Sequence, residues 1–271
     1  IGVFYIPHYG TNYSKFILKA KPSFIIIATP DETHFSILEN ILEMDFIPKL
    51  IICEKPICFV WDEYQKLVNH IKNKNIDVIV NHSRRFDNRF QKLKKEIRKN
   101  TFGHLVRGDF NTYGNWKKNG IHLIDSLVYL LSHKIENLPL KINTKKVNLK
   151  NGKWTDISIE FGNEFIINLN EHIEDYYQLF EMDFKFTKGR ILFQDFENRL
   201  FVEKKQINFL NENILNPAIL NSEEKQKSNM QSMIELVEAY FVNKKSLNEF
   251  SLKNMSATMK IYLKLLTYYE N

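Results

Sequence analysis

The stretch PKLIICEKP, residues 48–56, indicates the fold most clearly. Its short run of apolar residues has the length of a buried strand, and it ends in a glutamate, a lysine and a proline that cannot continue the strand. SFIIIATP at 23–30 and IDVIVNHS at 76–83 repeat this pattern, and amphipathic helix spacing separates the three runs at 31–44 and 61–74. Continuous apolar strands that alternate with helices predict a parallel sheet covered on both faces.

The first of these helices is expected to begin with Asp31 as its N-cap. Further along, helix patterns occur at 85–100 and 119–133, and from about 139 to 208 apolar and polar residues alternate as in antiparallel hairpins with one solvated face. We therefore predict two domains. Residues 1–84 form part of a doubly wound, Rossmann-like α/β domain, and residues 85–271 form an α+β domain with an open, mostly antiparallel sheet.

Composition narrows the classes of protein. The 271 residues are 44% hydrophobic and 26% charged, as is typical of globular proteins, and no run of about 18 apolar residues predicts a membrane span. Two cysteines cannot make a disulfide framework, so a reducing, cytoplasmic setting is expected. The net charge of +6 comes from scattered lysines without an arginine-rich, aromatic face. We predict neither a nucleic-acid nor a membrane partner.

The charged residues Glu54 and Lys55 at the end of this stretch are explained if they face a ligand. In a doubly wound parallel sheet, ligands bind beyond the carboxyl ends of the strands. Thr29 and Pro30, then Glu54 to Pro56, and finally Asn81 all fall at such ends. The crevice at this edge of the sheet is therefore the predicted site.

Four stretches, in this order, resemble the Gfo/Idh/MocA family of nicotinamide-dependent oxidoreductases: IATPDETH (27–34), CEKPI (53–57), NHSRRF (81–86) and NGIHLIDSLVYLL (119–131). FEMDFKFTKGRI (180–191) resembles a later strand and turn of that family. The resemblance implies an N-terminal Rossmann domain that holds NAD or NADP, and a C-terminal domain that holds a sugar, polyol or similar substrate. It also implies a homodimer or homotetramer formed through the C-terminal sheet.

By this resemblance, Lys55 of the E-K-P motif and His122 of the G-x-H-x-x-D motif meet at the nicotinamide. Oxidation of a secondary alcohol moves a hydride to the cofactor and a proton to a base, a role that suits His122. Lys55 would donate to the substrate oxygen, with Pro56 fixing the turn that aims it. Taken singly, a Glu-Lys pair at a strand end is usually only solvated, and a helical histidine is usually structural. The order of the motifs favours the catalytic roles.

The remaining candidates surround this pair. Asp125, one helical turn after His122, either binds substrate hydroxyls, orients the imidazole, or serves only as a cap or ion pair within its helix. His34 either faces the cofactor or solvates a helix start. Lys118 stands where many family members carry an acid and would suit an anionic substrate, unless it is simply an exposed loop lysine. The predicted cofactor-binding residues are Thr29, Pro30, His34, Glu54, Lys55, Pro56 and Asn81; the predicted substrate-binding residues are Asp125, Lys118, Asn119 and Arg85.

Other reactive side chains are assigned no chemistry. We take His82 and His104 as structural or surface residues, and Cys53 and Cys58 as small core residues rather than nucleophiles. No metal site is predicted.

One family feature does not occur in this sequence: the G-x-G-x-x-G turn that binds the pyrophosphate. We expect the sequence as given to begin inside the Rossmann domain; the alternative is a natural short form. The choice between NAD and NADP stays open. We predict an NAD(P)-dependent oxidoreductase that acts on a hydroxyl or keto group of a sugar or nucleotide-sugar derivative. The alternatives are a catalytically silent sugar- or cofactor-binding protein of the same fold, acting as sensor or scaffold, and a structural subunit.

Overall fold

The computed structural model describes residues 13–72, 74–114, 116–150, 152–172, 177–217, 227–243 and 245–270. They form two compact units. The first contains the described residues up to 82 together with 239–263, and the second contains 83–238 together with 264–270. The first break, after residue 82, lies within two residues of the boundary predicted at 84. The prediction that residues 85–271 form one domain is wrong for 239–263, which belong to the first unit because the chain returns to it.

The first unit is built on a parallel sheet of three strands, as predicted. Its strands are β1 (Phe24–Ile27), β2 (Leu50–Cys53) and β3 (Asp77–Val80), in the order β1-β2-β3. Ile27, Cys53 and Val80 stand in register at the carboxyl ends. All four residues of the central strand β2 are buried, which explains why its sequence is apolar without alternation.

The helices of this unit are α1 (Tyr13–Ala20), α2 (His34–Glu43) and α3 (Trp61–Lys72). The prediction that Asp31 caps the second helix is wrong. Asp31 instead begins a 3-10 turn, η1 (Asp31–Thr33), and the N-cap position of α2 is Thr33. Pro30 has the fixed φ of a residue that opens a turn, so the chain begins to coil before the helix proper. Among the described residues, no helix has the length and apolar character needed to cross a bilayer.

A late segment completes the first unit. It runs from the end of α6 (Asn229–Asn243) through the short turns η4 (Asn248–Phe250) and η5 (Leu252–Asn254) into α7 (Ser256–Glu270). Ser251 forms a β-bridge with Ile79 of β3, and Tyr64 Oη donates a 2.9 Å hydrogen bond to the carbonyl oxygen of Leu252. The tail of the chain therefore supplies part of the core of its first unit.

The second unit is a mixed sheet of eight strands in the order β11-β10-β9-β8-β4-β7-β6-β5. All neighbours are antiparallel except β4 and β7, which are parallel. The strands are β4 (Leu105–Tyr113), β5 (Leu140–Leu149), β6 (Gly152–Phe161), β7 (Phe165–His172), β8 (Phe180–Phe186), β9 (Gly189–Gln194), β10 (Arg199–Ile207) and β11 (Asn213–Pro217).

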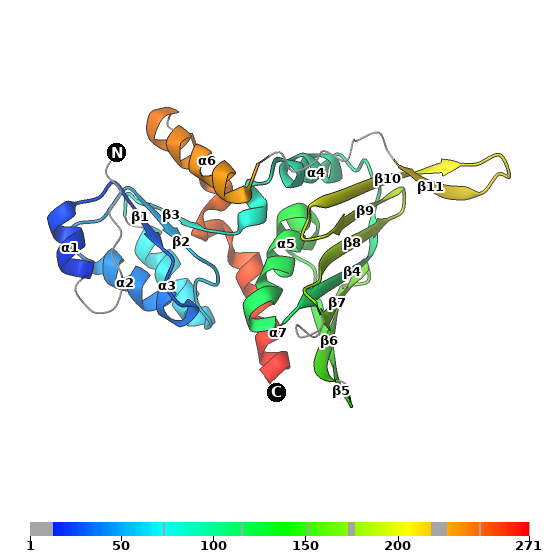
Figure 1. Cartoon of the computed structure of the whole chain (residues 1–271), viewed down its shortest axis with the longest axis horizontal. Helices are drawn as coiled ribbons and strands as arrows, with labels where there is room; N and C mark the ends of the chain where they lie inside the picture. The colour runs from blue at the N-terminus through cyan, green and yellow to red at the C-terminus, as the bar shows by residue number, and fades with distance from the viewer. Residues whose placement is uncertain are drawn as a thin grey trace. The chain divides into compact units, whose positions relative to one another are not determined.

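Two helices lie along one face of this sheet (Figure 1). They are α4 (Asn88–Arg98) and α5 (Ile121–Ile135), and Phe90 of α4 stacks on Phe193 of β9 with 4.5 Å between ring centroids. Buried and half-buried residues alternate strictly along β8 and β9. The opposite face carries polar side chains such as Asp109 and Lys185. The prediction of an open, mostly antiparallel sheet with one solvated face is confirmed.

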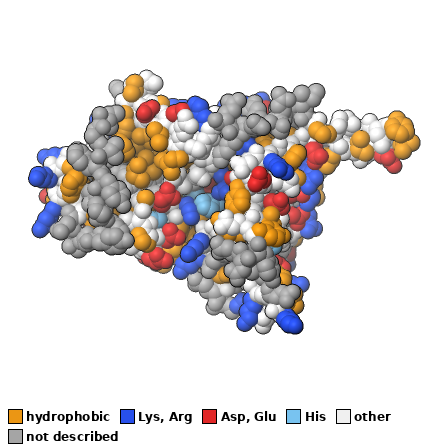
Figure 2. All heavy atoms as spheres, viewed as in Figure 1, with side chains coloured by type: hydrophobic (Ala, Val, Ile, Leu, Met, Phe, Trp, Pro, Cys, Tyr) orange, Lys and Arg blue, Asp and Glu red, His pale blue; other side chains and the backbone are white. Residues whose placement is uncertain are grey.

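The β10–β11 hairpin ends in exposed apolar residues. Figure 2 shows apolar side chains gathered at the tip of this hairpin, where Phe209 is 94% exposed and Ile207 and Leu210 are exposed too.

Candidate functional site

In the first unit, the predicted site lies where the three strands end. The amide of Glu54 donates to the carbonyl of Ile27 at 2.9 Å, and the amide of Asn81 donates to the carbonyl of Cys53 at 2.7 Å, so the parallel ladder continues past the strands. The side-chain amide of Asn81 then donates to Glu54 Oε1 at 2.5 Å. These bonds bring the segments after β2 and β3 together at one edge of the sheet.

His34 joins the segment after β1 to the segment after β2. Its side chain has no exposed surface, its Nδ1 lies 2.7 Å from the carbonyl oxygen of Pro56, and its Nε2 lies 2.8 Å from the carbonyl oxygen of Thr29. Carbonyl oxygens accept hydrogen bonds, so the imidazole N–H of His34 donates to the main chain of one of these two segments and its ring contacts the other. His34 therefore neither faces a ligand nor solvates a helix start; it links the segment after β1 to the segment after β2.

Lys55 stands on the segment that His34 holds. It is half-buried, and the peptide bond to the buried Pro56 is cis. Of its predicted neighbours, Thr29 is half-buried and Pro30 is exposed. The hydroxyl oxygen of Thr33 lies 2.7 Å from both the hydroxyl of Thr29 and the carbonyl oxygen of Pro30, within hydrogen-bond distance of each. The structure thus gathers Thr29, Pro30, Glu54, Lys55 and Asn81 at one sheet edge, as predicted.

In the second unit, His122 occupies the second position of α5 and is half-buried. The residues before it form a tight π-helical turn, η3 (Trp116–Gly120), in which the Trp116 indole donates to the carbonyl of Thr155 at 3.0 Å. A side chain at Gly120 would lie 2.4 Å from the Trp116 ring, so only glycine fits there. The predicted Asn119 donates to the carbonyl of Tyr113 at 2.8 Å, and Lys118 is exposed.

Two predicted substrate residues contact each other. The guanidinium of Arg85 donates to both carboxylate oxygens of Asp125 at 2.7 to 3.1 Å, and the two residues are only 4% and 2% exposed. Asp125 thus forms an ion pair as one alternative proposed, but with a segment 40 residues earlier rather than within its own helix. This pair fixes α5 against η2 (Ser83–Phe86); substrate binding by either residue stays a prediction.

The surroundings of His122 include residues that the sequence analysis missed. The His122 ring meets the ring of Phe180 edge-on at 6.4 Å, and the guanidinium of Arg84 lies over Phe180 at 4.0 Å. Arg84 also forms an ion pair with Glu197. Arg84 lies in the quoted stretch NHSRRF and Phe180 opens FEMDFKFTKGRI, but neither residue is among the predicted site residues.

The thiols behave as core residues, as expected. Both cysteines are buried and unpaired. Burial raises the pKa of Cys58 to about 12, and burial, followed by the negative charge of Glu54, raises the pKa of Cys53 well above its ordinary value. A thiol that keeps its proton is a poor nucleophile.

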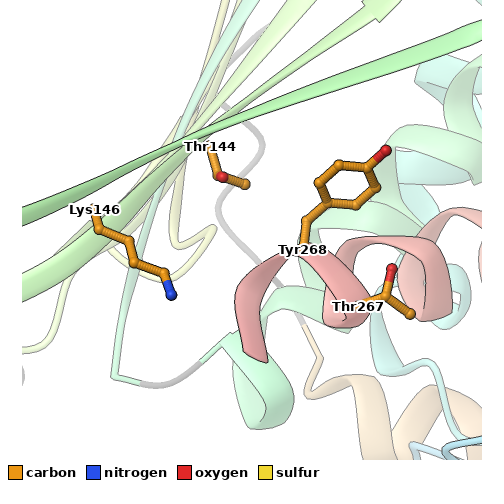
Figure 3. Close-up of a pocket in the computed structure, with 4 residues that line it drawn as sticks. All are labelled: Thr144, Lys146, Thr267 and Tyr268. Atoms are coloured by element: carbon orange, nitrogen blue, oxygen red, sulfur yellow. The ribbon is translucent and has the colours of Figure 1, made fainter. Parts of the chain in front are cut away.

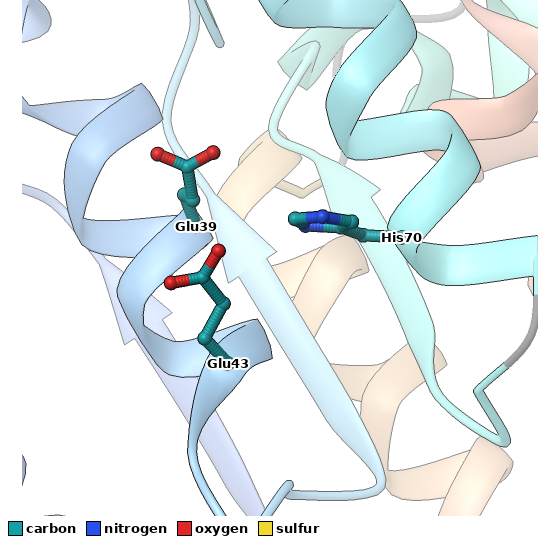
Figure 4. Close-up of side chains that lie close together, drawn as sticks. All are labelled: Glu39, Glu43 and His70. Atoms are coloured by element: carbon teal, nitrogen blue, oxygen red, sulfur yellow. The ribbon is translucent and has the colours of Figure 1, made fainter.

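Two other features lie outside the predicted site. Glu39, Glu43 and His70 bring potential metal-ligand atoms within 4.8 Å of one another between α2 and α3 (Figure 4). Lys66 forms an ion pair with Glu39, and the hydrogen bond to that carboxylate raises the pKa of Lys66. Glu43 and His70 belong to the C-terminal turns of helices that run back from the carboxyl edge of the sheet, so the group is remote from the strand ends.

An open groove of 630 Å³ occurs in the second unit (Figure 3). Thr144 and Lys146 of β5 line one side, and Thr267 and Tyr268 of α7 line the other. All four are exposed, and none belongs to the predicted site.

The strand ends suit the nicotinamide part of a dinucleotide. They offer the half-buried hydroxyl of Thr29, the main chain at Glu54 and the ammonium of Lys55 along one sheet edge. Polar groups on a short, half-buried rim are what the amide and ribose of a nicotinamide nucleotide require. No residue of this chain is assigned to the pyrophosphate, because the sequence contains no G-x-G-x-x-G.

Comparison with known proteins agrees with this arrangement. Residues 3–82 match the oxidoreductase family Gfo/Idh/MocA, described as an NAD-binding Rossmann fold. Two uncharacterized oxidoreductases of Schizosaccharomyces pombe are 26% identical over 138 residues and 25% identical over 139 residues. Each match covers 44% of this chain and only 37% of the relative's length.

Solved structures share the fold over nearly the whole chain. An oxidoreductase from Bacillus cereus aligns with a TM-score of 0.66 at 15% identity, over 90% of this chain and 78% of its own. The UDP-N-acetylglucosamine 3-dehydrogenase of Acidithiobacillus ferrooxidans aligns with a TM-score of 0.67 at 13% identity, over 93% and 79%. The family model thus matches the first part of the chain, over residues 3–82, and the solved oxidoreductases share the fold of nearly the whole chain.

Proposed function

We propose that this chain, as a Gfo/Idh/MocA oxidoreductase, transfers a hydride between NAD(P) and a hydroxyl or keto group of a sugar or sugar derivative. The observation that carries the proposal is the position of Lys55. It stands at the carboxyl end of the central strand of a parallel sheet, on a segment fastened on one side by His34 and on the other by Asn81. A lysine that merely solvates a strand end needs no such support.

The proposed roles follow from the side chains. His122 accepts the hydroxyl proton of the substrate, a step that needs an accessible imidazole, and its half-buried position at the start of α5 provides one. Lys55 donates to the substrate oxygen and, in the reverse direction, polarises the carbonyl. Bound NAD(P) supplies the hydride acceptor at nicotinamide C4. The convergence of Lys55 and His122 on one carbon–oxygen bond is part of the proposal.

The test compares two lysines that flank the same strand, β2, one at each end. Lys55→Met removes the ammonium at the carboxyl end of β2, and the control Lys49→Met removes an exposed ammonium just before its amino end. NAD(P)H absorbance is followed with a panel of sugars, sugar acids and nucleotide sugars. We expect Lys55→Met and His122→Asn each to lower kcat by about 10²- to 10⁴-fold, with little change for Lys49→Met.

Two results would refute parts of the proposal. An unmutated protein that neither binds NAD(P)H nor turns over any substrate of the panel is not an oxidoreductase of this class. Equal activity of Lys55→Met and Lys49→Met would remove Lys55 from the chemistry even if turnover occurs.

A further inference from the structure

The turn between β9 and β10 is strained. Three consecutive residues, Asp195, Phe196 and Glu197, have φ values of 52°, 52° and 63°. None is glycine, and each L-residue in this region brings its Cβ close to the following carbonyl oxygen. Left-handed residues normally occur singly, and a run of three needs other interactions to hold it.

An ion pair and an aromatic ring hold this turn. The carboxylate of Glu197, which is 5% exposed, pairs with the guanidinium of Arg84. That guanidinium lies 4.0 Å from the centre of the Phe180 ring, a cation–π contact. Because Glu197 neutralises Arg84, the assembly presents no net charge.

The strained backbone places Phe196 in a row of rings that leads to His122. Phe196 packs edge-on against Tyr113 at 5.6 Å and parallel to Phe180 at 6.3 Å, and Phe180 meets His122. Asn119 binds the main chain at Tyr113, which ties the turn before His122 to the same row. Phe180 is buried, whereas Tyr113 and Phe196 are half-buried and keep part of their ring surface open.

We propose that the 195–197 turn is a substrate-recognition element, and that Phe196 and Tyr113 form an aromatic wall that takes the C–H face of a saccharide ring beside His122. The face of an aromatic ring is electron-rich, and the C–H groups on one side of a pyranose carry partial positive charge, so the two attract. An uncharged wall selects for this apolar face and not for an anionic group. The inference rests on the proposed function for the role of His122.

The test measures saccharide binding without turnover. Glucose, N-acetylglucosamine and UDP-N-acetylglucosamine are titrated by calorimetry, and saturation-transfer NMR identifies the sugar protons that contact the protein. Phe196→Ala should weaken the tightest of these by about tenfold and abolish the transfer to the sugar C–H protons. Phe201→Ala is the matched control, because Phe201 lies on β10 of the same hairpin and is 43% exposed. It should leave binding within about twofold.

Two further variants guard against misfolding. Phe196→Leu keeps an apolar side chain and loses the aromatic face, so it should weaken binding like Phe196→Ala, whereas Phe196→Tyr should restore it. The proposed aromatic wall would be refuted if Phe196→Leu bound saccharides as tightly as the unmutated protein, or if the unmutated protein bound none of the three. Saccharide binding that depends on Phe196 in a protein without NAD(P)H turnover would support the wall while refuting the proposed function.

Discussion

The two units build their halves of the predicted site from different materials. In the first, the predicted site residues stand on short segments of backbone that are joined by hydrogen bonds to carbonyl oxygens, chiefly through His34. In the second, His122 stands on a helix fixed by a buried ion pair, Arg85 with Asp125, and its ring meets Phe180 edge-on. A substitution that removes a hydrogen bond of the first kind should loosen a loop while the unit stays folded. A substitution that breaks the buried ion pair should lower the stability of the whole second unit.

The largest effect on stability is expected for Asp125→Ala. Removing one partner of a buried ion pair leaves the other charge uncompensated, which costs about 3–5 kcal/mol. We expect the free energy of unfolding of the second unit to fall by that amount. Urea denaturation in a Trp61→Phe background, where the remaining fluorescence comes from Trp116 and Trp154 of this unit, measures it.

The double variant Arg85→Met with Asp125→Leu is the control. It removes both charges and replaces them with apolar side chains, and it should recover most of the lost stability. A cost below about 1 kcal/mol for Asp125→Ala would mean that the pair is hydrated and contributes no more than a surface ion pair.

The second prediction concerns His34. His34→Leu leaves the carbonyl oxygens of Thr29 and Pro56 without their partner, at a cost of about 2 kcal/mol, smaller than that expected for Asp125→Ala. Its main effect should be local: faster amide hydrogen exchange at residues 54–58 and a lower kcat, because Lys55 is no longer aimed.

His70→Leu is the matched control for His34→Leu, since it changes a half-buried histidine of the same unit that lies away from the strand ends. His34→Gln, whose amide can donate to one of the two carbonyls, should restore part of the protection from exchange. If His34→Leu lowers global stability without faster exchange at 54–58, the histidine is a core residue and not a link between loops.

The difference between the units also explains what the sequence could predict. Runs such as LIIC and DVIV, because they alternate with helix patterns, predict buried parallel strands, and the position of the residues at their carboxyl ends then follows from the topology of the sheet. Lys55 could therefore be placed at a sheet edge without a structure. His122 could be placed at a helix start because the apolar spacing of 119–133 is strong.

Partners that are distant in the chain could not be predicted in this way. Arg84 and Glu197 are separated by 113 residues, and periodicity carries no information on which carboxylate a given arginine meets. The return of residues 239–263 to the first unit could not be predicted for the same reason. The pattern of an amphipathic helix shows that one face is buried, but it does not show which part of the chain covers that face. His34 was selected by its motif, yet its bonds are to main-chain carbonyls, which every sequence offers.

The smallest expected effect comes from the polar face of the second unit, outside its buried part. Burial raises the pKa of Asp109, but hydrogen bonds from Lys185, Asn168 and Arg107 outweigh it, so the pKa of this carboxyl lies below its ordinary value of 3.8. Its contribution to stability is therefore fully present above the pKa of the unfolded chain and is lost as the pH falls through the lower, folded value. The melting temperature of Asp109→Asn should lie slightly below that of the unmutated protein at pH 7, and the gap should close on acidification towards pH 2. Lys185→Met removes one hydrogen-bond donor to Asp109 and should narrow the same difference in melting temperature. A difference that widens in acid would show instead that the ionised carboxylate of Asp109 destabilises the folded protein.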